Sequence, residues 1–283
     1  MISLGFSPCP NDTFIFYALT NKIIDLKGLN FSLLIKDVET LNQLAIKKKV
    51  DVTKISCHAF YYLQEDYHFL RAGGAFGRGC GPLLVVRTQE SEVRSSKIKK
   101  IAIPGKLTTA FLLLKLYLSS TSITSYFSLI TSHFIPMPFH KIMEAVRDEK
   151  VDAGLIIHES RFTYQKYGLS QIVDLGEWWE KETGLPLPLG GIIAKKSLGI
   201  QNIKTIESLI RESVEYSIHN KEEVMPFIKQ YSQELSDDVI FKHISLYVND
   251  YTIDIGSEGK AALNELIKRA KGVETIANKG VQP

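Results

Sequence analysis

Two spacings of apolar residues alternate along the chain. Segments such as Val38 to Lys48 place Leu41, Leu44 and Ala45 three or four positions apart, which predicts amphipathic helices. Short apolar runs such as Ile2 to Phe6 are typical of strands. In the first third of the chain these patterns predict strands at 2–6, 29–35, 50–55 and 83–87, and helices at 13–21, 38–48 and 59–65. Strands that alternate with helices favour an α/β fold with a largely parallel sheet.

The alternation begins again near residue 101 and ends in a helical C-terminal tail. Strands are predicted at 101–103, 134–137, 151–157 and 189–194, helices at 110–118 and 140–148, and tail helices at 206–219, 222–234, 237–247 and 258–271. The polar segment 88–96 and the segment 185–191, rich in proline and glycine, are candidate boundaries. We therefore expect a larger, discontinuous α/β lobe of residues 1–88 and 190–283 and a smaller α/β lobe of residues 89–189. A cleft would lie between the lobes, with a hinge at the two crossings.

Composition and charge exclude several classes of protein. Of the 283 residues, 45% are hydrophobic and 23% are charged, which is ordinary for a globular protein and unlike a disordered chain or a coiled coil. The net charge of +3 is too small to favour nucleic acid or an anionic membrane surface as a partner. No apolar run reaches the length that spans a bilayer, and the N-terminus lacks the regions of a signal peptide, so we expect a cytoplasmic protein.

Several motifs of known chemistry are missing from the sequence. There is no P-loop, no H-E-x-x-H and no G-x-S-x-G, and the glycine-rich stretch at 77–81 precedes a strand where a dinucleotide fingerprint would open a helix. The three cysteines, Cys9, Cys57 and Cys80, form no C-x-x-C pair, which disfavours both a disulfide framework and a zinc site built on thiolates.

Small and polar residues instead follow four of the predicted strands. These segments are 7–13, 54–58, 105–109 and 158–160, two from each expected lobe. In open parallel sheets ligands bind beyond the carboxyl ends of the strands, where helix N-termini offer unpaired N–H groups to an anion. The four segments therefore predict one binding site for a small anionic molecule.

Each of these residues also has a structural interpretation. Asn11, Asp12 and Ser56 could be helix caps, and so could Thr108 or Thr109. Lys54 lies among apolar neighbours, so it needs a partner or a cleft unless it occupies a solvated edge of the sheet. His158 follows the buried-type run 154–157, and a lone histidine in that setting can be structural or catalytic.

Read together, these motifs resemble one known family, the 1,4-dihydroxy-6-naphthoate synthases of the futalosine route to menaquinone. The resemblance rests on the segments 7–14 (Ser-Pro-Cys-Pro-Asn-Asp-Thr-Phe), 54–56 (Lys-Ile-Ser), 79–83 (Gly-Cys-Gly-Pro-Leu), 108–110 (Thr-Thr-Ala), 156–160 (Ile-Ile-His-Glu-Ser) and 185–191 (Leu-Pro-Leu-Pro-Leu-Gly-Gly). It runs from residue 2 to about residue 200, and only the combination of motifs is specific.

The resemblance implies a two-lobed, periplasmic-binding-protein-like (type II) fold used as a lyase. It implies conversion of cyclic dehypoxanthinyl futalosine to 1,4-dihydroxy-6-naphthoate with release of dihydroxyacetone, without a metal or organic cofactor. On the family pattern His158 is the proton acceptor. Lys54, Ile55, Ser56, Thr108 and Thr109 fall on substrate-contacting positions. We add Ser7, Asn11 and Arg78 as further substrate-binding candidates.

Two other functions remain open from the sequence. One is a two-lobed solute-binding protein that closes on a small carboxylate without chemistry. The other is the sister activity of the same pathway, chorismate dehydratase, which is not expected to combine this opening segment with His-Glu-Ser at 158–160. The expected partner is a small-molecule carboxylate in each case, and the sequence leaves open whether the chain forms a homodimer.

Overall fold

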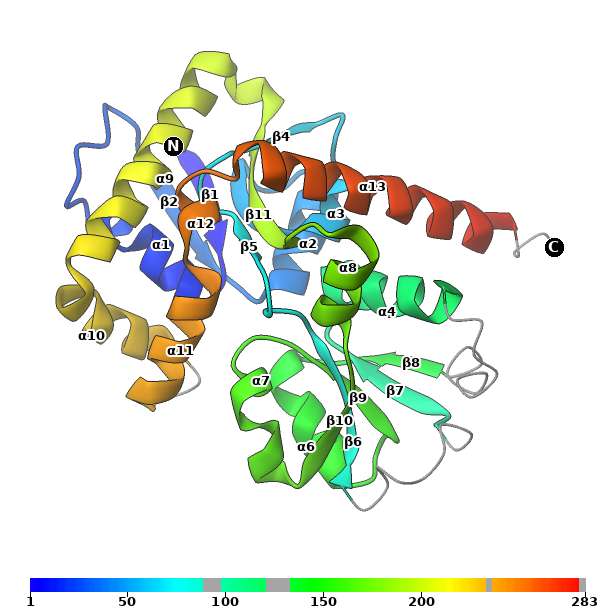
Figure 1. The fold of residues 1–283 in the computed structure, drawn as a ribbon. Helices are drawn as coiled ribbons and strands as arrows, with labels where there is room; N and C mark the ends of the chain where they lie inside the picture. Colours follow the sequence, from blue (N-terminus) through cyan, green and yellow to red (C-terminus); the bar gives the residue numbers. More distant parts are fainter. Residues whose placement is uncertain (89–97, 121–132, 233–235, 280–283) are drawn as a thin grey trace. The chain divides into compact units, whose positions relative to one another are not determined.

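The computed structural model describes residues 1–88, 98–120, 133–232 and 236–279 (Figure 1). The chain divides into two compact units, and each is built from two stretches of sequence. The first unit comprises Met1–Gly77 and Pro188–Ile267, and the second comprises Arg78–Leu187 and Lys268–Pro283. No helix in the described ranges is both long enough and apolar enough to cross a membrane.

The first unit is built on a mixed sheet with the strand order β2-β1-β3-β11-β4, in which β5 also pairs with β11. Strand β1 pairs in parallel with β2 and β3, whereas β11 runs antiparallel to β3 and β4. The expectation of a largely parallel sheet is therefore only half right. The strands are β1 (Ile2–Phe6), β2 (Phe31–Ile35), β3 (Val52–Ser56), β4 (Tyr67–Phe69), β5 (Ala75–Gly77) and β11 (Leu187–Lys195).

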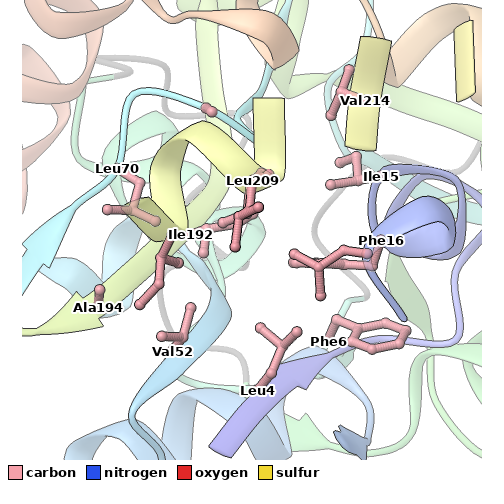
Figure 2. Close-up of a cluster of buried hydrophobic side chains, with 14 of the residues drawn as sticks. Leu4, Phe6, Ile15, Phe16, Val52, Leu70, Ile192, Ala194, Leu209 and Val214 are labelled. Atoms are coloured by element: carbon pink, nitrogen blue, oxygen red, sulfur yellow. The ribbon is translucent and has the colours of Figure 1, made fainter. Parts of the chain in front are cut away.

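Helices from both ends of the sequence belong to this unit, and the last of them, α13, continues into the second unit. The N-terminal helices are α1 (Pro10–Thr20), α2 (Val38–Ile46) and α3 (Cys57–Phe60); the C-terminal ones are α9 (Ile200–His219), α10 (Lys221–Tyr231), α11 (Asp237–Tyr247), α12 (Asp250–Ile253) and α13 (Gly256–Lys279), after the 3-10 turn Lys196–Leu198. Figure 2 shows the core, where Phe6 of β1, Phe16 of α1 and Leu209 of α9 lie in one cluster. The Phe6 and Phe16 rings stack with their centroids 4.8 Å apart. This apolar contact holds the middle of α1 against the end of β1.

The second unit has its own mixed sheet, with the order β10-β6-β9-β7-β8. Strand β7 is parallel to β8 and β9, and β6 is antiparallel to β9 and β10. The strands are β6 (Leu83–Arg87), β7 (Lys100–Ile103), β8 (His133–Pro136), β9 (Ala153–Ile156) and β10 (Leu169–Asp174); the helices are α4 (Thr109–Ser120), α6 (Ile142–Arg147), α7 (Ser160–Thr163) and α8 (Leu175–Thr183), with 3-10 turns at Phe139–Lys141 and Tyr164–Tyr167.

The unit boundaries differ from the boundaries that the sequence predicts. The first crossing lies at residues 77 and 78, because β6 pairs with β9 and β10 and so belongs to the second sheet. The second crossing lies at 187 and 188, close to the predicted residue 190, and residues 268–283 belong to the second unit. Most of the polar segment 88–96 that suggested a boundary lies outside the described residues.

Candidate functional site

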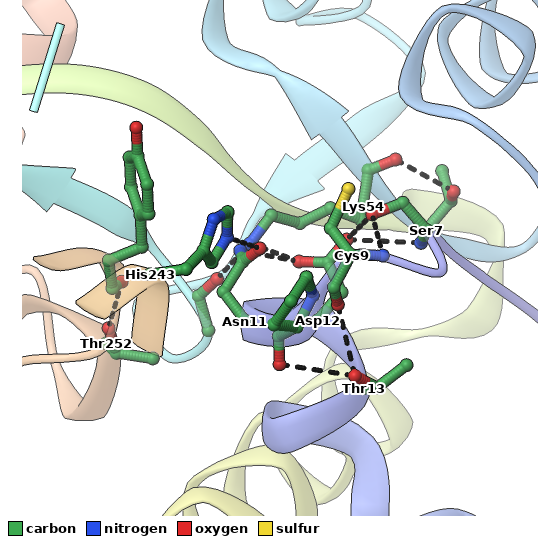
Figure 3. A network of polar contacts seen from close by, with 12 residues as sticks. Ser7, Cys9, Asn11, Asp12, Thr13, Lys54, His243 and Thr252 are labelled. Carbon is green, nitrogen blue, oxygen red and sulfur yellow. Dashed lines mark hydrogen bonds and ion pairs between the residues drawn. The ribbon is translucent and has the colours of Figure 1, made fainter. Parts of the chain in front are cut away.

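The Asp12 carboxylate organises the polar residues at the end of β1 in the first unit (Figure 3). Its Oδ2 accepts hydrogen bonds from the Ser7 N–H at 3.1 Å and from the Ser7 hydroxyl at 2.7 Å. Its Oδ1 accepts from the Asn11 amide nitrogen at 3.0 Å. Asp12 sits in the first turn of α1, but it reaches back to the preceding strand end and does not cap the helix, whose N-cap is Cys9. The capping interpretation of Asn11 and Asp12 is therefore wrong.

Lys54 completes this network from β3. Its Nζ lies 3.1 Å from Asp12 Oδ1 and donates to the Gly73 carbonyl oxygen at 2.9 Å. Strand β3 lies between β1 and β11, so the solvated-edge interpretation of Lys54 is wrong and the expectation of a partner is confirmed. Lys54 is 4% exposed and Asp12 is 2% exposed. Because two charges at this depth lose their hydration, each depends on the other and on the surrounding hydrogen bonds.

Asn11 links the network to the C-terminal helices of the same unit. Its Oδ1 lies 3.0 Å from Nε2 of His243, a fully buried residue of α11. Ser7 and Asn11, both substrate-binding candidates, therefore use their side chains to hold Asp12. Together, Ser7, Asn11, Asp12, Lys54 and His243 form what we call the Asp12 network.

Ser56 occupies the end of β3 and the start of α3. Its N–H donates to Asn42 Oδ1 at 2.9 Å, and its hydroxyl accepts from Asn42 Nδ2 at 3.2 Å. Ser56 is the N-cap residue by position, but its side chain makes no capping bond, so Asn42 and not the helix fixes its rotamer. Burial raises the pKa of the neighbouring Cys57 thiol well above its usual range, which makes it a neutral side chain and not a nucleophile. Ile55, which precedes Ser56, is fully buried in the strand.

In the second unit, Thr108 and Thr109 begin helix α4 after β7. The Thr108 hydroxyl donates to the Gly105 carbonyl oxygen at 2.8 Å and accepts from the Phe111 N–H at 3.3 Å. Thr108 is therefore the N-cap, which confirms the structural interpretation for this residue. Thr109 is the first residue of the 12-residue helix and is 2% exposed. The positive end of the helix dipole at this point suits a negatively charged ligand.

His158 comes two residues after β9 ends and directly before the short segment that leads into α7. Its φ of 57° places it in the left-handed region, which is uncommon for a residue with a side chain. Its ring packs against Phe139, with 5.0 Å between the centroids. Backbone strain at a half-buried histidine is a feature of functional sites, where the surrounding structure holds a costly conformation in place.

Arg161 anchors the segment that carries His158. Its guanidinium donates to the Gly81 carbonyl oxygen and to Asp174 Oδ2, both at 2.6 Å. The other Asp174 oxygen accepts from the N–H groups of Gly176 and Glu177 and so caps α8. A charge-assisted bond of this kind is stronger than a neutral one, so it ties the His158 segment to β10 and to the start of α8.

Arg78 lies at the first residue of the second unit and is exposed. Its Nη2 donates to the Gly184 carbonyl oxygen at 2.9 Å, and the neighbouring Gly79 N–H donates to Glu180 at 2.7 Å. Burial raises the pKa of the nearby Cys80 thiol to about 12.

Across the described ranges, no group of three or more His, Cys, Asp and Glu side chains is placed to hold a metal ion.

The structure therefore brings the candidates together in two groups. Ser7, Asn11, Lys54 and Ser56 lie at neighbouring strand ends of the first unit, and Thr108, Thr109 and His158 follow strand ends of the second. The sequence interpretation missed His243, Arg161 and Asp174. A signal for His243 exists, because Val239, Ile240, His243, Ile244 and Tyr247 are spaced as one buried helix face, and a histidine there needs a polar partner.

Comparisons with known proteins agree on one family. Residues 2–272 match the model of a family described as menaquinone biosynthesis. A curated relative from Thermus thermophilus, 1,4-dihydroxy-6-naphthoate synthase, is 43% identical over 272 residues, which cover 95% of this chain and 94% of the relative.

Two solved structures place the fold. A protein from Archaeoglobus fulgidus has a TM-score of 0.86 at 36% identity, and the match covers 96% of this chain and 97% of the Archaeoglobus chain. A Candida albicans protein is described as having the generic periplasmic binding protein fold. It has a TM-score of 0.68 at 14% identity, and the match covers 96% of this chain and 95% of the Candida protein. These likenesses confirm the expected periplasmic-binding-protein-like fold with a helical C-terminal tail.

Proposed function

This chain belongs to the menaquinone-biosynthesis family and, within it, to the 1,4-dihydroxy-6-naphthoate synthases, and we propose that it is the carbon–carbon lyase that converts cyclic dehypoxanthinyl futalosine to 1,4-dihydroxy-6-naphthoate and dihydroxyacetone. The observation that supports this reaction most directly is His158, a strained and half-buried histidine at the carboxyl end of a strand. It stands where the resemblance expects the proton acceptor.

The proposed cleavage is of the retro-aldol type. A neutral His158 imidazole takes the proton of a substrate hydroxyl group. The carbon–carbon bond to the three-carbon fragment then breaks, and its electron pair forms an enolate that needs hydrogen-bond donors. Aromatisation of the remaining ring supplies the driving force, so the reaction balances without an oxidant or a reductant.

Lys54 is suited to the donor role. An ammonium group has three N–H donors, and among the described residues Asp12 and Gly73 accept two of them. We assign the third to the substrate. Because Asp12 balances its charge, Lys54 acts as a fixed hydrogen-bond donor to the developing enolate and not as the main partner of the carboxylate.

We assign the substrate carboxylate to Thr108, Thr109 and the N-terminus of α4. The positive dipole end and the hydroxyl of Thr109 suit an anion there, whereas the Thr108 hydroxyl already caps the helix. Ile55, Ser56, Ser7, Asn11 and Arg78 complete the proposed substrate-binding residues. Of these, Ser7 and Asn11 act through Asp12.

The test is to incubate the purified protein with cyclic dehypoxanthinyl futalosine and to quantify both products. The proposal predicts that dihydroxyacetone and 1,4-dihydroxy-6-naphthoate appear in equal amounts. Parallel reactions contain chorismate as the substrate. Tight binding of the substrate with no product would favour the solute-binding alternative, and consumption of chorismate would favour the sister dehydratase; either result contradicts the proposal.

A further inference from the structure

His243 is a fully buried ionisable residue that the proposed reaction does not yet use. It belongs to α11, is 0% exposed, and comes 232 residues after the residue it contacts, Asn11. Helix α11 packs against α1 through an apolar cluster that includes Phe14, Ile240 and Ile244. The Tyr247 ring also contacts the imidazole, with 4.6 Å between the centroids. The ring is thus held in place by apolar contacts as well as by Asn11.

The hydrogen bonds of the Asp12 network fix which atom donates at each step. The Asp12 carboxylate can only accept, so the Asn11 amide must turn its NH₂ group toward Asp12 Oδ1. Asn11 Oδ1 then faces His243, and because an amide oxygen can only accept, the His243 Nε2 must carry the proton that it donates (Figure 3). The hydrogen bond from His243 therefore adds to the preference for this orientation of the Asn11 amide, because a flipped amide would lose it.

The orientation of Asn11 in turn determines the position of the ion pair. Asp12 Oδ1 receives both the Asn11 amide and the Lys54 ammonium, while Oδ2 receives two bonds from Ser7. If Asn11 rotated by half a turn, its oxygen would face the carboxylate and repel it. The buried pair would then have to shift, and Lys54 Nζ would shift with it.

We infer that His243 is a positioning residue for the proposed cleavage, acting through Asn11 and Asp12 to hold the Lys54 ammonium where it donates to the developing enolate. This inference rests on the proposed function. It predicts that His243 affects the chemical step more than substrate binding, because the Lys54 donor matters most when charge develops in the transition state.

The experiment compares three variants in single-turnover and steady-state assays. His243→Leu removes the donor, and we expect kcat to fall by about 10-fold or more with a smaller change in KM, as for a buried hydrogen-bonding group left without its partner. His243→Gln places an amide N–H near the position of Nε2, and we expect it to restore kcat to within a few-fold of the parent. The control Ser217→Ala removes a buried hydrogen bond, from the Ser217 hydroxyl to the Phe14 carbonyl oxygen, that also supports α1.

A purely structural role makes the opposite prediction. His243→Leu would then resemble Ser217→Ala, with a lower melting temperature but an unchanged kcat per folded molecule, and that result would overturn the inference. Equal activity of the Leu and Gln variants would do the same. Should His243→Leu not fold, His243→Gln and Asn11→Leu can still be compared, since the inference requires the Asn11 variant to lose kcat while the Gln variant keeps it.

One measurement is independent of turnover. Long-range ¹H–¹⁵N spectra of the parent protein, with ¹⁵N-labelled histidine, report which ring nitrogen of His243 carries the proton. A proton on Nε2 is the expected result, and an unprotonated Nε2 contradicts the inference. Loss of the proposed function would appear instead as a parent protein that makes no product, so the two failures are distinguishable.

Discussion

The polar residues at the strand ends are held in different ways in the two units. In the first unit the side chains hold one another: Asp12 accepts from Ser7, Asn11 and Lys54, and His243 fixes Asn11. In the second unit the backbone conformation contributes more to positioning the side chain: His158 adopts a left-handed conformation just after the end of β9. A network of satisfied hydrogen bonds suits groups that must stay fixed. A half-buried side chain on a strained turn suits a group that exchanges protons with a ligand.

The largest expected effect lies at His158. His158→Asn should keep the fold, because asparagine tolerates the left-handed region better than most residues. Turnover should fall by about 10²–10⁴-fold, the usual contribution of a general base. Single-turnover rates and the melting temperature, measured on the same preparation, separate a catalytic role from a structural one. A stable, fully active Asn variant would remove His158 from the mechanism.

The next effect tests the burial of the Lys54–Asp12 pair. Two lysines on neighbouring strands have the same 3.1 Å distance to an aspartate oxygen, but the side chains of Lys54 and Asp12 are 5% and 3% exposed, whereas those of Lys195 and Asp51 are 22% and 28% exposed. Lys54→Met leaves the buried Asp12 carboxylate without its cationic partner, and this should lower the free energy of unfolding by about 3–5 kcal/mol. Lys195→Met should cost at most about 1 kcal/mol. Urea unfolding of both variants measures the difference, and equal losses would contradict the distinction drawn from burial.

A smaller effect is expected at the start of α4. Thr109→Val keeps the shape of the side chain and removes its hydroxyl, so substrate binding should weaken by roughly 1–3 kcal/mol with little change in kcat. Thr108→Val is the comparison variant, because its hydroxyl caps the helix and its loss should lower stability as well. If Thr109→Val left both KM and kcat unchanged, the carboxylate would have to bind elsewhere.

The smallest effect concerns Asp51, outside the Asp12 network. Partial burial alone would raise the pKa of Asp51, but hydrogen bonds from the Ser3 N–H and hydroxyl and from Lys195 outweigh it and lower the pKa. A carboxyl with a lowered pKa stabilises the folded state above its unfolded pKa of about 4, and that contribution is lost as the pH falls through the folded pKa. Ser3→Ala should therefore reduce stability more at pH 7 than at low pH, where the loss is limited to the bond that the Ser3 hydroxyl accepts from the Asp51 N–H at 2.8 Å. A loss that is equal at both ends would show that the Ser3 hydroxyl does not act through Asp51.

The sequence predicted most of the helices and strands, and the failures have physical reasons. Strand β6 has the predicted bounds because it is an unbroken apolar run that stops at Arg87, and helix α11 has them because its apolar residues recur at helical spacing. Strands β4 and β5 have three residues each, which is too short for any period. The antiparallel direction of β11 could not be predicted, since the direction of a strand depends on its neighbours and not on its own residues.

In the candidate site too, local sequence predicts some residues, whereas tertiary packing decides their partners. Local context was enough to select Lys54, Thr108 and His158, because each one interrupts or follows an apolar strand. Their partners were not accessible in this way. The sequence offers Asp12 as a helix cap or as a member of the site segment 7–13, but not as the partner of a lysine 42 positions later, and Arg161 reaches Asp174 through the fold of the second unit. Pairings between distant residues depend on tertiary packing, and a single sequence does not contain that information in local form.

A structure of the protein with 1,4-dihydroxy-6-naphthoate bound would test the account most directly. The account predicts that the product carboxylate contacts Thr109 at the N-terminus of α4 and that the His158 imidazole lies within hydrogen-bond distance of a product hydroxyl. Product bound away from both residues, in a protein that still shows turnover, would contradict the central claim.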